Sequence, residues 1–125
     1  MQENPVTKTI LLVEDDAIVA LDQERRLRSF GYSVIKAYSA ESALEVVREN
    51  RQIDLILMDI DLGAGMDGTE AAKEILRFRE HPIVFVTSHS ERSMVEKVKD
   101  ITRYGYILKS AGEFVLAESI EMALN

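Results

Sequence analysis

The chain of 125 residues contains no cysteine and no tryptophan. Without cysteine, disulfide bonds, thiolate zinc sites and cysteine nucleophiles are all excluded. Long hydrophobic runs are also missing, because the longest have four or five residues, far fewer than a membrane span needs. The opening segment MQENPVTK has neither the positive charge nor the apolar stretch of a signal peptide. We therefore expect a cytoplasmic protein that does not contact a membrane.

Positive charge is scarce as well. The chain has 15 Lys and Arg against 22 Asp and Glu, a net charge of −7, and no basic block. This balance argues against binding nucleic acid through bulk electrostatics. Apolar residues make up 46% of the chain, a value typical of globular domains. The length suits one domain with one core, which we expect to span 1–125 with its core at about 8–124.

Five short apolar runs, rich in β-branched residues, are candidate strands. They lie at 9–13, 32–37, 54–58, 82–86 and 105–109. Their near-continuous apolarity is typical of parallel strands covered on both faces. The intervals fit one helix each, at 17–30, 39–50, 69–78, 90–101 and 113–124. Strict alternation predicts a doubly wound α/β sheet with right-handed crossovers and disfavours a mixed α+β domain.

The apolar spacing also predicts which side of two helices is buried. In the first helix, the residues expected to face the core are Ala17, Ile18 and Leu21. In the last helix, they are Val115, Leu116, Ile120 and Ala123. Asp16 precedes the first helix and is expected to cap its N-terminus or to lie in solvent at its first turn.

A run of three carboxylates at 14–16 follows the first strand directly. Like charges this close repel one another, and partial burial would push their pKa values upward. With strand order 2-1-3-4-5, the first and third strands are neighbours at the switch point of the sheet. Asp59, at the end of the third strand, should then lie beside Glu14 and Asp15. Such crowding needs a compensating cation.

Carboxylate oxygens without histidine or cysteine are typical ligands of Mg²⁺ or of a similar ion such as Mn²⁺. Thr87 and Lys109 end the fourth and fifth strands and should face the same edge. A carboxylate beside a cation, a hydroxyl and an ammonium can accept a phosphoryl group, because such transfers need neutralised charge and an in-line nucleophile. We predict that Asp59 is this nucleophile and forms an acyl phosphate. Lys109 and the metal would hold two phosphoryl oxygens, and Thr87 would donate a hydrogen bond to the third.

Four motifs resemble, in their order and spacing, those of the receiver domain of two-component response regulators, of the chemotaxis-regulator type. They are ILLVEDD, LILMDIDLGAGMDG, PIVFVTS and GYILKS. The resemblance covers essentially the whole chain and implies a single flavodoxin-like (βα)5 domain. It also implies that Asp59 is the phosphoacceptor. The implied metal ligands are Glu14, Asp15, Asp59 and the main-chain carbonyl of Asp61.

The resemblance further implies how phosphorylation becomes a signal. Thr87 would turn toward the phosphate, Tyr106 would turn inward, and the face of the fourth helix, fifth strand and fifth helix would change shape for a partner. The phosphodonor would be a sensor histidine kinase or a histidine phosphotransfer domain, and the output a downstream protein or a linked domain. Asp61 and His89 would modulate access to the phosphate and its lifetime. Such a domain is no enzyme beyond catalysing its own phosphorylation and dephosphorylation.

Two features depart from the family pattern. Ser110 stands where a proline usually follows the lysine. A cis bond before a non-proline residue costs roughly 3 kcal/mol, so we predict a trans 109–110 bond or a rearranged loop. The turn LGAGMDG is one residue longer than usual, with Gly63 where proline is common, which predicts a more mobile loop.

Three other interpretations fit less well. GAGMDG spells the G-x-G-x-x-G of dinucleotide sites, but the aspartates around it would repel a pyrophosphate. DID at 59–61 resembles the D-x-D of haloacid-dehalogenase-type phosphatases, which carry it on the first strand rather than the third. A receiver-like adaptor without phosphotransfer is disfavoured because a degenerate domain should have lost at least one site residue. All of those residues are present: Asp15, Asp59, Thr87 and Lys109.

Overall fold

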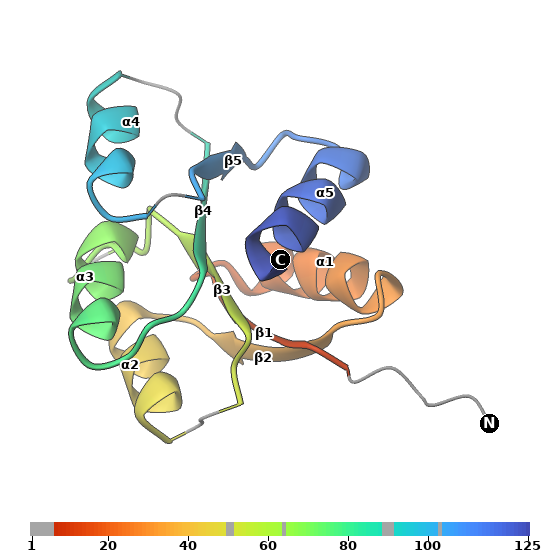
Figure 1. Cartoon of the computed structure of the whole chain (residues 1–125), viewed down its shortest axis with the longest axis horizontal. Helices are drawn as coiled ribbons and strands as arrows, with labels where there is room; N and C mark the ends of the chain where they lie inside the picture. The colour runs from red at the N-terminus through yellow and green to blue at the C-terminus, as the bar shows by residue number, and fades with distance from the viewer. Residues whose placement is uncertain (1–6, 50–51, 64, 89–91, 103) are drawn as a thin grey trace.

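The computed structural model describes residues 7–49, 52–63, 65–88, 92–102 and 104–125, with strands and helices in strict alternation (Figure 1). The strands are β1 (Thr9–Val13), β2 (Ser33–Ala37), β3 (Leu55–Asp59), β4 (Ile83–Thr87) and β5 (Tyr106–Leu108). The helices are α1 (Ala17–Ser29), α2 (Ala40–Glu49), α3 (Gly68–Phe78), α4 (Arg92–Lys99) and α5 (Glu113–Leu124). All strands pair in parallel, in the order β2-β1-β3-β4-β5. The predicted fold class and strand order are confirmed.

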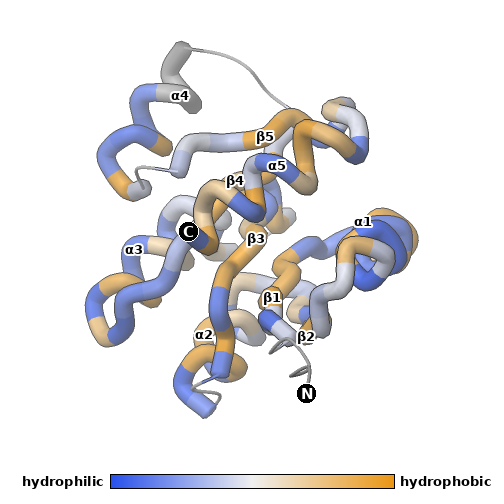
Figure 2. The backbone as a smooth tube through the Cα atoms, turned by 45° about the vertical axis from the view of Figure 1, so that its right-hand side comes forward, coloured by the Kyte–Doolittle hydropathy of each residue, from blue (hydrophilic) through white to orange (hydrophobic). Residues whose placement is uncertain are grey.

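Different helices cover the two faces of the sheet. α1 and α5 lie on one face, and α2, α3 and α4 lie on the other (Figure 1). Alternate residues of β1 enter the two cores, with Ile10 and Leu12 on the α1–α5 side and Leu11 and Val13 on the opposite side. Every residue of β3 and β4 is buried, and Figure 2 shows these strands mostly in orange. Their hydrophobicity on both faces is therefore explained by helices on both sides.

The predicted inward face of α1 is wrong. Ala17 is exposed, Ile18 is 82% exposed and Leu21 is 43% exposed, whereas Ala20 and Leu27 are buried. The helix begins where Asp16 caps it, and from that start positions 20 and 27, two turns apart, face the sheet. Two apolar side chains of the first turns therefore point outward.

The last helix follows its prediction at three of the four positions. Leu116, Ile120 and Ala123 of α5 are buried, but Val115 is 49% exposed. Val115 precedes Leu116 by one residue, a rotation of about 100° around the helix, so both cannot face the sheet.

Two loops depart from the family pattern, and the greater mobility expected of the β3–α3 loop stays a prediction. No cis peptide bond occurs among the described residues, so the trans bond predicted at 109–110 is confirmed. In the β3–α3 loop, Gly63 and Gly65 have φ values of 74° and 92°, a region that L side chains rarely adopt. None of the described helices combines the length and apolarity that crossing a membrane requires.

Candidate functional site

Three of the predicted side chains are buried at the carboxyl edge of the sheet. The pairing of Val13 with Met58 brings the ends of β1 and β3 together, so Glu14 and Asp59 follow side by side. Thr87 ends β4, one residue beyond the partner of Asp59. Glu14, Asp59 and Thr87 are at most 2% exposed. Acidic and hydroxyl groups are thus buried together at one edge of the sheet.

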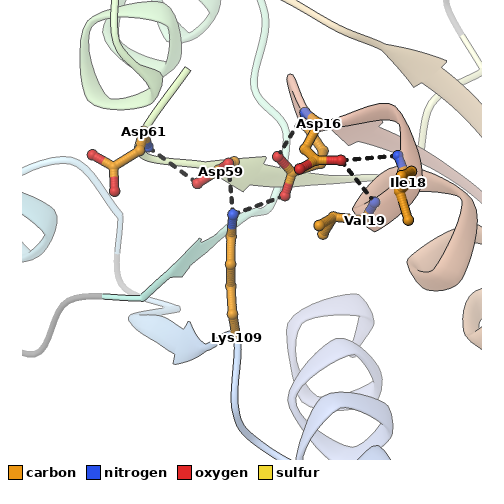
Figure 3. A network of polar contacts seen from close by, with 7 residues as sticks. Asp16, Ile18, Val19, Asp59, Asp61 and Lys109 are labelled. Atoms are coloured by element: carbon orange, nitrogen blue, oxygen red, sulfur yellow. Dashed lines mark hydrogen bonds and ion pairs between the residues drawn. The ribbon is translucent and has the colours of Figure 1, made fainter. Parts of the chain in front are cut away.

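Lys109 connects the two buried carboxylates. Its Nζ lies 3.0 Å from Asp59 Oδ2, to which it donates a hydrogen bond (Figure 3), and 2.9 Å from Glu14 Oε1. The contact with Glu14 is an ion pair, and its angles do not meet those of a hydrogen bond. The Lys109 main-chain N–H donates to the Thr87 carbonyl at 2.8 Å, which ties the lysine to the end of β4. The sequence predicted that Lys109 faces this edge of the sheet, and its contact with both carboxylates is a new feature.

Main-chain amides hold the second oxygen of each buried carboxylate. The Asp16 N–H donates to Glu14 Oε2 at 3.1 Å, and the Asp61 N–H donates to Asp59 Oδ1 at 3.1 Å. The Asp61 side chain is exposed and points away from Asp59 (Figure 3). Each carboxylate is therefore oriented by one amide and one ammonium.

Asp16 has a structural role, as predicted. Its side chain accepts hydrogen bonds from the N–H groups of Ile18 and Val19, at 2.9 and 3.2 Å (Figure 3). This N-cap satisfies two amides of the first turn of α1. Of the three consecutive carboxylates, one caps the helix and the other two remain for the site.

Burial and like charge both act on the acidic groups. Burial raises the pKa of Glu14, and the neighbouring Asp59 raises it further, while Lys109 opposes the shift. Burial likewise raises the pKa of Asp59 against the effect of Glu14 and Lys109. Burial alone would lower the pKa of Lys109, but its two carboxylate partners outweigh that effect and raise it. The lysine therefore stays an ammonium at neutral pH.

Three carboxylates are close enough to share a cation. Oxygen atoms of Glu14, Asp15 and Asp59 all lie within 4.8 Å of one another. Asp15 is exposed, so the cluster opens to solvent on its side. Partial desolvation and the neighbouring Glu14 raise the pKa of Asp15. An all-oxygen set with an open side fits Mg²⁺, which prefers such ligands and keeps several waters. The role predicted for the Asp61 carbonyl stays a prediction.

The predicted switch residues lie on β4 and β5. Thr87 is fully buried, and Tyr106, the first residue of β5, is half-buried against the core beneath α2, α3 and α4. Tyr106 pairs with Phe85 and so lies farther from the carboxyl edge than Thr87 does. His89 lies outside the described residues, so its modulating role stays a prediction.

Gly68 is a residue of the site that the sequence did not reveal. A Cβ at this position would lie 2.0 Å from the Asp59 main-chain oxygen, and the Gly68 N–H donates to the Ile60 carbonyl at 2.9 Å. The start of α3 is therefore pressed against the main chain of the predicted nucleophile. Only the position of a glycine at the first residue of a helix could have indicated this contact.

Asp67 was also missed as a structural residue. Its side chain accepts from the Glu70 N–H at 2.9 Å, and the Glu70 side chain accepts from the Asp67 N–H, which forms a capping box. Asp67 also pairs with Lys97 of α4 at 3.4 Å. The pattern D-x-x-E at 67–70 was the available signal.

Comparison with known proteins gives one consistent family. A family model described as the response regulator receiver domain matches residues 10–121. The transcriptional regulatory protein PdtaR of Mycobacterium tuberculosis is 33% identical over 121 residues, which is 96% of this chain and 58% of PdtaR. This chain thus spans less than two thirds of that relative.

Solved structures resemble the whole chain. The N-terminal domain of a response regulator/sensory box/GGDEF 3-domain protein from Carboxydothermus hydrogenoformans is 47% identical, with a TM-score of 0.86 and coverage of 94% of both chains. A CheY-like response regulator receiver domain protein from Methanospirillum hungatei is 28% identical, with a TM-score of 0.86 and coverage of 95% of this chain and 94% of that one.

Proposed function

The chain belongs to the response regulator receiver domain family, and we propose that it accepts a phosphoryl group on Asp59. Its cluster of Glu14, Asp15 and Asp59 fits the phosphoacceptor site of that family. Receiver domains bind Mg²⁺ through acidic residues and interact with histidine kinases and output domains. For this chain, the phosphodonor is a sensor histidine kinase or a histidine phosphotransfer protein, and the cation is Mg²⁺.

One observation carries the proposal. Side chains from segments 50 residues apart in the chain, Asp59 and Lys109, meet at 3.0 Å at the edge of the sheet, beside a second buried carboxylate. Burying two carboxylates destabilises a fold unless they are paired. A structural purpose would be served better by apolar residues at these positions, so the arrangement supports a chemical role.

The geometry supports a direct displacement. An oxygen of Asp59 forms a bond to phosphorus, the bond from phosphorus to the donor imidazole breaks, and the imidazole leaves with its electron pair. The Asp61 amide and the Lys109 ammonium hold the nucleophile in one orientation. Glu14, Asp15 and Asp59 would hold Mg²⁺, which would neutralise negative charge on the transferring oxygens.

Lys109 has a second task in this proposal. Before transfer, its ammonium is shared between Glu14 and Asp59, so it already lies where negative charge accumulates. After transfer it pairs with a phosphoryl oxygen, and the Thr87 hydroxyl donates to another. Because the pKa of Lys109 is raised, the positive charge is present throughout.

Phosphorylation then changes the α4–β5–α5 face. The added phosphoryl group brings nearly one more negative charge and three acceptors to a buried location. In the proposed switch, Thr87 turns toward these acceptors and Tyr106 moves farther into the core against which it already packs. The partner of this face is a downstream protein or a linked output domain.

The phosphodonor is proposed to cover the first turns of α1. Ile18 is 82% exposed and its N–H is bonded to Asp16, directly beside the acidic cluster (Figure 3). An apolar side chain at the entrance of a polar site is suited to packing against a docking protein. A small phosphodonor such as acetyl phosphate does not need the surface around Ile18.

Several narrower points belong to the same proposal. We propose that the receiver domain spans 1–125, with its core at about 8–124, and the family match over 10–121 supports this proposal. Receiver domains are generally not enzymes, and we propose that this one catalyses only its own phosphorylation and dephosphorylation. Neither the adaptor nor the phosphatase interpretation is favoured by a specific observation. A cytoplasmic location stays a prediction.

Intact-mass analysis after incubation with acetyl phosphate tests the proposal. With Mg²⁺, the protein is expected to gain one phosphoryl group, and the gain is expected to vanish with EDTA or with Asp59→Asn. Unchanged mass despite measurable Mg²⁺ binding would support the adaptor. Turnover of p-nitrophenyl phosphate, lost in Asp59→Asn, would support the phosphatase.

A further inference from the structure

The β3–α3 loop lies against the exposed carboxylate of the acidic cluster. A Cβ on Gly63 would lie 3.3 Å from Asp15 Oδ2, a tighter approach than most Cβ atoms make. Among the described residues, and apart from the chain neighbours of Gly63, no other heavy atom lies within 4 Å of that position. At the other end of the same segment, the Asp61 N–H donates to Asp59 Oδ1 at 3.1 Å (Figure 3). The segment 61–63 therefore connects two of the three clustered carboxylates.

Buried contacts hold the main chain that leads into this loop. The Ile60 carbonyl accepts a hydrogen bond from the Gly68 N–H at 2.9 Å, which fixes the end of β3 to the start of α3. The side chain of Leu62 is 5% exposed and packs in the core beneath α2, α3 and α4. The loop therefore has little freedom to retreat from the carboxylate that it contacts.

Asp15 is the partner that can move. Its side chain is exposed and has room to rotate into solvent, whereas Glu14 and Asp59 are buried. Repulsion between the carboxylates favours such a rotation, because it carries one negative charge away from the other two. A side chain at position 63 would press on Asp15 Oδ2 and would be accommodated by the same rotation. The third oxygen ligand would then leave the cluster.

We propose that Gly63 is a positioning residue of the Mg²⁺ site, because its missing side chain lets the Asp15 carboxylate stay beside those of Glu14 and Asp59. The inference rests on the proposed function, in which these three carboxylates hold the ion. The φ value of 74° also favours glycine at this position. Position 63 thus combines a backbone requirement with a steric one, and the two can be separated by experiment.

Mg²⁺ titration of the ¹⁵N-labelled full chain, without a phosphodonor, tests the inference. The amides of Asp16 and Asp61 report binding, since each donates to a carboxylate of the cluster. Gly63→Ala is expected to weaken Mg²⁺ binding roughly tenfold, as the loss of groups that orient metal ligands commonly does. Phosphorylation by acetyl phosphate should then be slow at low Mg²⁺ and reach the wild-type rate at saturating Mg²⁺. A rate that stays low at saturating Mg²⁺ would mean that the loop acts on Asp59 instead, which overturns the inference.

Two alanine variants separate the contact with Asp15 from backbone strain. Gly31, between α1 and β2, has a φ of 99°, and a Cβ there meets nothing within 4 Å. Gly65, in the same loop as Gly63, has a φ of 92°, and its Cβ would make only an ordinary contact at 3.7 Å with Glu41 Oε2. Gly31→Ala and Gly65→Ala are expected to lower stability but to leave Mg²⁺ affinity unchanged. Unchanged affinity in Gly63→Ala, or an equal loss in Gly65→Ala, overturns the inference.

Two further variants complete the test. Gly63→Asn carries the same Cβ but tolerates a positive φ better than alanine, so it is expected to lose affinity even if Gly63→Ala fails to fold. In an Asp15→Ala background the Oδ2 atom is gone, and Gly63→Ala should have no further effect on Mg²⁺ binding; a second tenfold loss there overturns the inference.

The outcomes also distinguish this inference from the proposed function. A wild-type protein that binds Mg²⁺ but gains no phosphoryl group would contradict the proposed function and leave the role of Gly63 standing. A wild type that is phosphorylated, with Mg²⁺ affinity unchanged in Gly63→Ala, would contradict only the role of Gly63. Absence of any Mg²⁺-dependent shift in the wild type would contradict both.

Discussion

Replacing Gly68 by alanine tests how closely the start of α3 approaches the predicted nucleophile. The new Cβ would lie 2.0 Å from the Asp59 oxygen and 2.9 Å from both the Asp59 carbonyl carbon and the Ile60 Cα. All three atoms belong to the main chain, so no flexible side chain can move aside. The helix start and the end of β3 must separate by well over an ångström, which stretches the bond from the Gly68 N–H to Ile60.

The expected cost follows from these contacts. Overpacking in a tight core costs about 1–3 kcal/mol, and a weakened main-chain hydrogen bond adds about 1 kcal/mol. The stiffer unfolded chain of the alanine variant returns about 0.4–1 kcal/mol. We expect Gly68→Ala to lower the free energy of unfolding by roughly 2–3 kcal/mol and the melting temperature by roughly 10 °C. Because the Asp59 main chain moves, phosphorylation by acetyl phosphate should slow by roughly tenfold or more.

Urea unfolding followed by far-UV circular dichroism measures the effect, since the chain has no tryptophan. Gly112→Ala is the matched control, because a Cβ there meets nothing within 4 Å and its φ is −74°. We expect the control to change stability by less than about 1 kcal/mol. If Gly68→Ala proves as stable as Gly112→Ala, the close approach and the reasoning built on it are refuted.

Three further substitutions test the cap of α3, the buried Glu14 and the exposed start of α1. Asp67→Ala should cost about 1 kcal/mol at pH 7 by removing the cap of α3. Burial alone would raise the pKa of Asp67, but Thr69, the Glu70 amide and Lys97 outweigh burial and lower it. The difference in stability between the variant and the wild type, measured by urea titration, should therefore disappear as the pH falls through that lowered pKa. Glu14→Gln should stabilise the metal-free protein at pH 7. Burial and Asp59 raise the pKa of Glu14, so the contribution of Glu14 to the free energy of unfolding is favourable at low pH and is lost as the pH rises through that pKa. Equal stability of the variant and the wild type at pH 7 would contradict this prediction. Ile18→Asp should slow phosphotransfer from a kinase but not from acetyl phosphate, and equal slowing of both would argue against the docking surface on α1.

The strand order and the acidic cluster could be predicted because each depends on a simple pattern. Near-continuous apolar runs identify buried parallel strands, and parallel strands place their last residues at one edge. That rule alone predicts that the carboxylates of Glu14, Asp15 and Asp59 lie close together. In the structure their oxygen atoms lie within 4.8 Å of one another.

The remaining features depend on contacts that periodicity does not encode. The apolar residues Ile18 and Leu21 suggested an inward face, yet the capped start of α1 turns them outward. Nothing in the spacing relates Gly68 to the main chain of Asp59, nor Lys109 to Glu14. These are close approaches between loops, and loop paths are set by tertiary packing rather than by local sequence.

Borohydride trapping locates the phosphorylated carboxylate in the sequence. Borohydride reduces an aspartyl phosphate to homoserine, which tandem mass spectrometry locates in the sequence. After incubation with Mg²⁺ and acetyl phosphate, we predict homoserine at position 59 alone, and none in Asp59→Asn or without acetyl phosphate. Reduction at position 14, 15 or 61 instead, in a protein that gains a phosphoryl group, would contradict it.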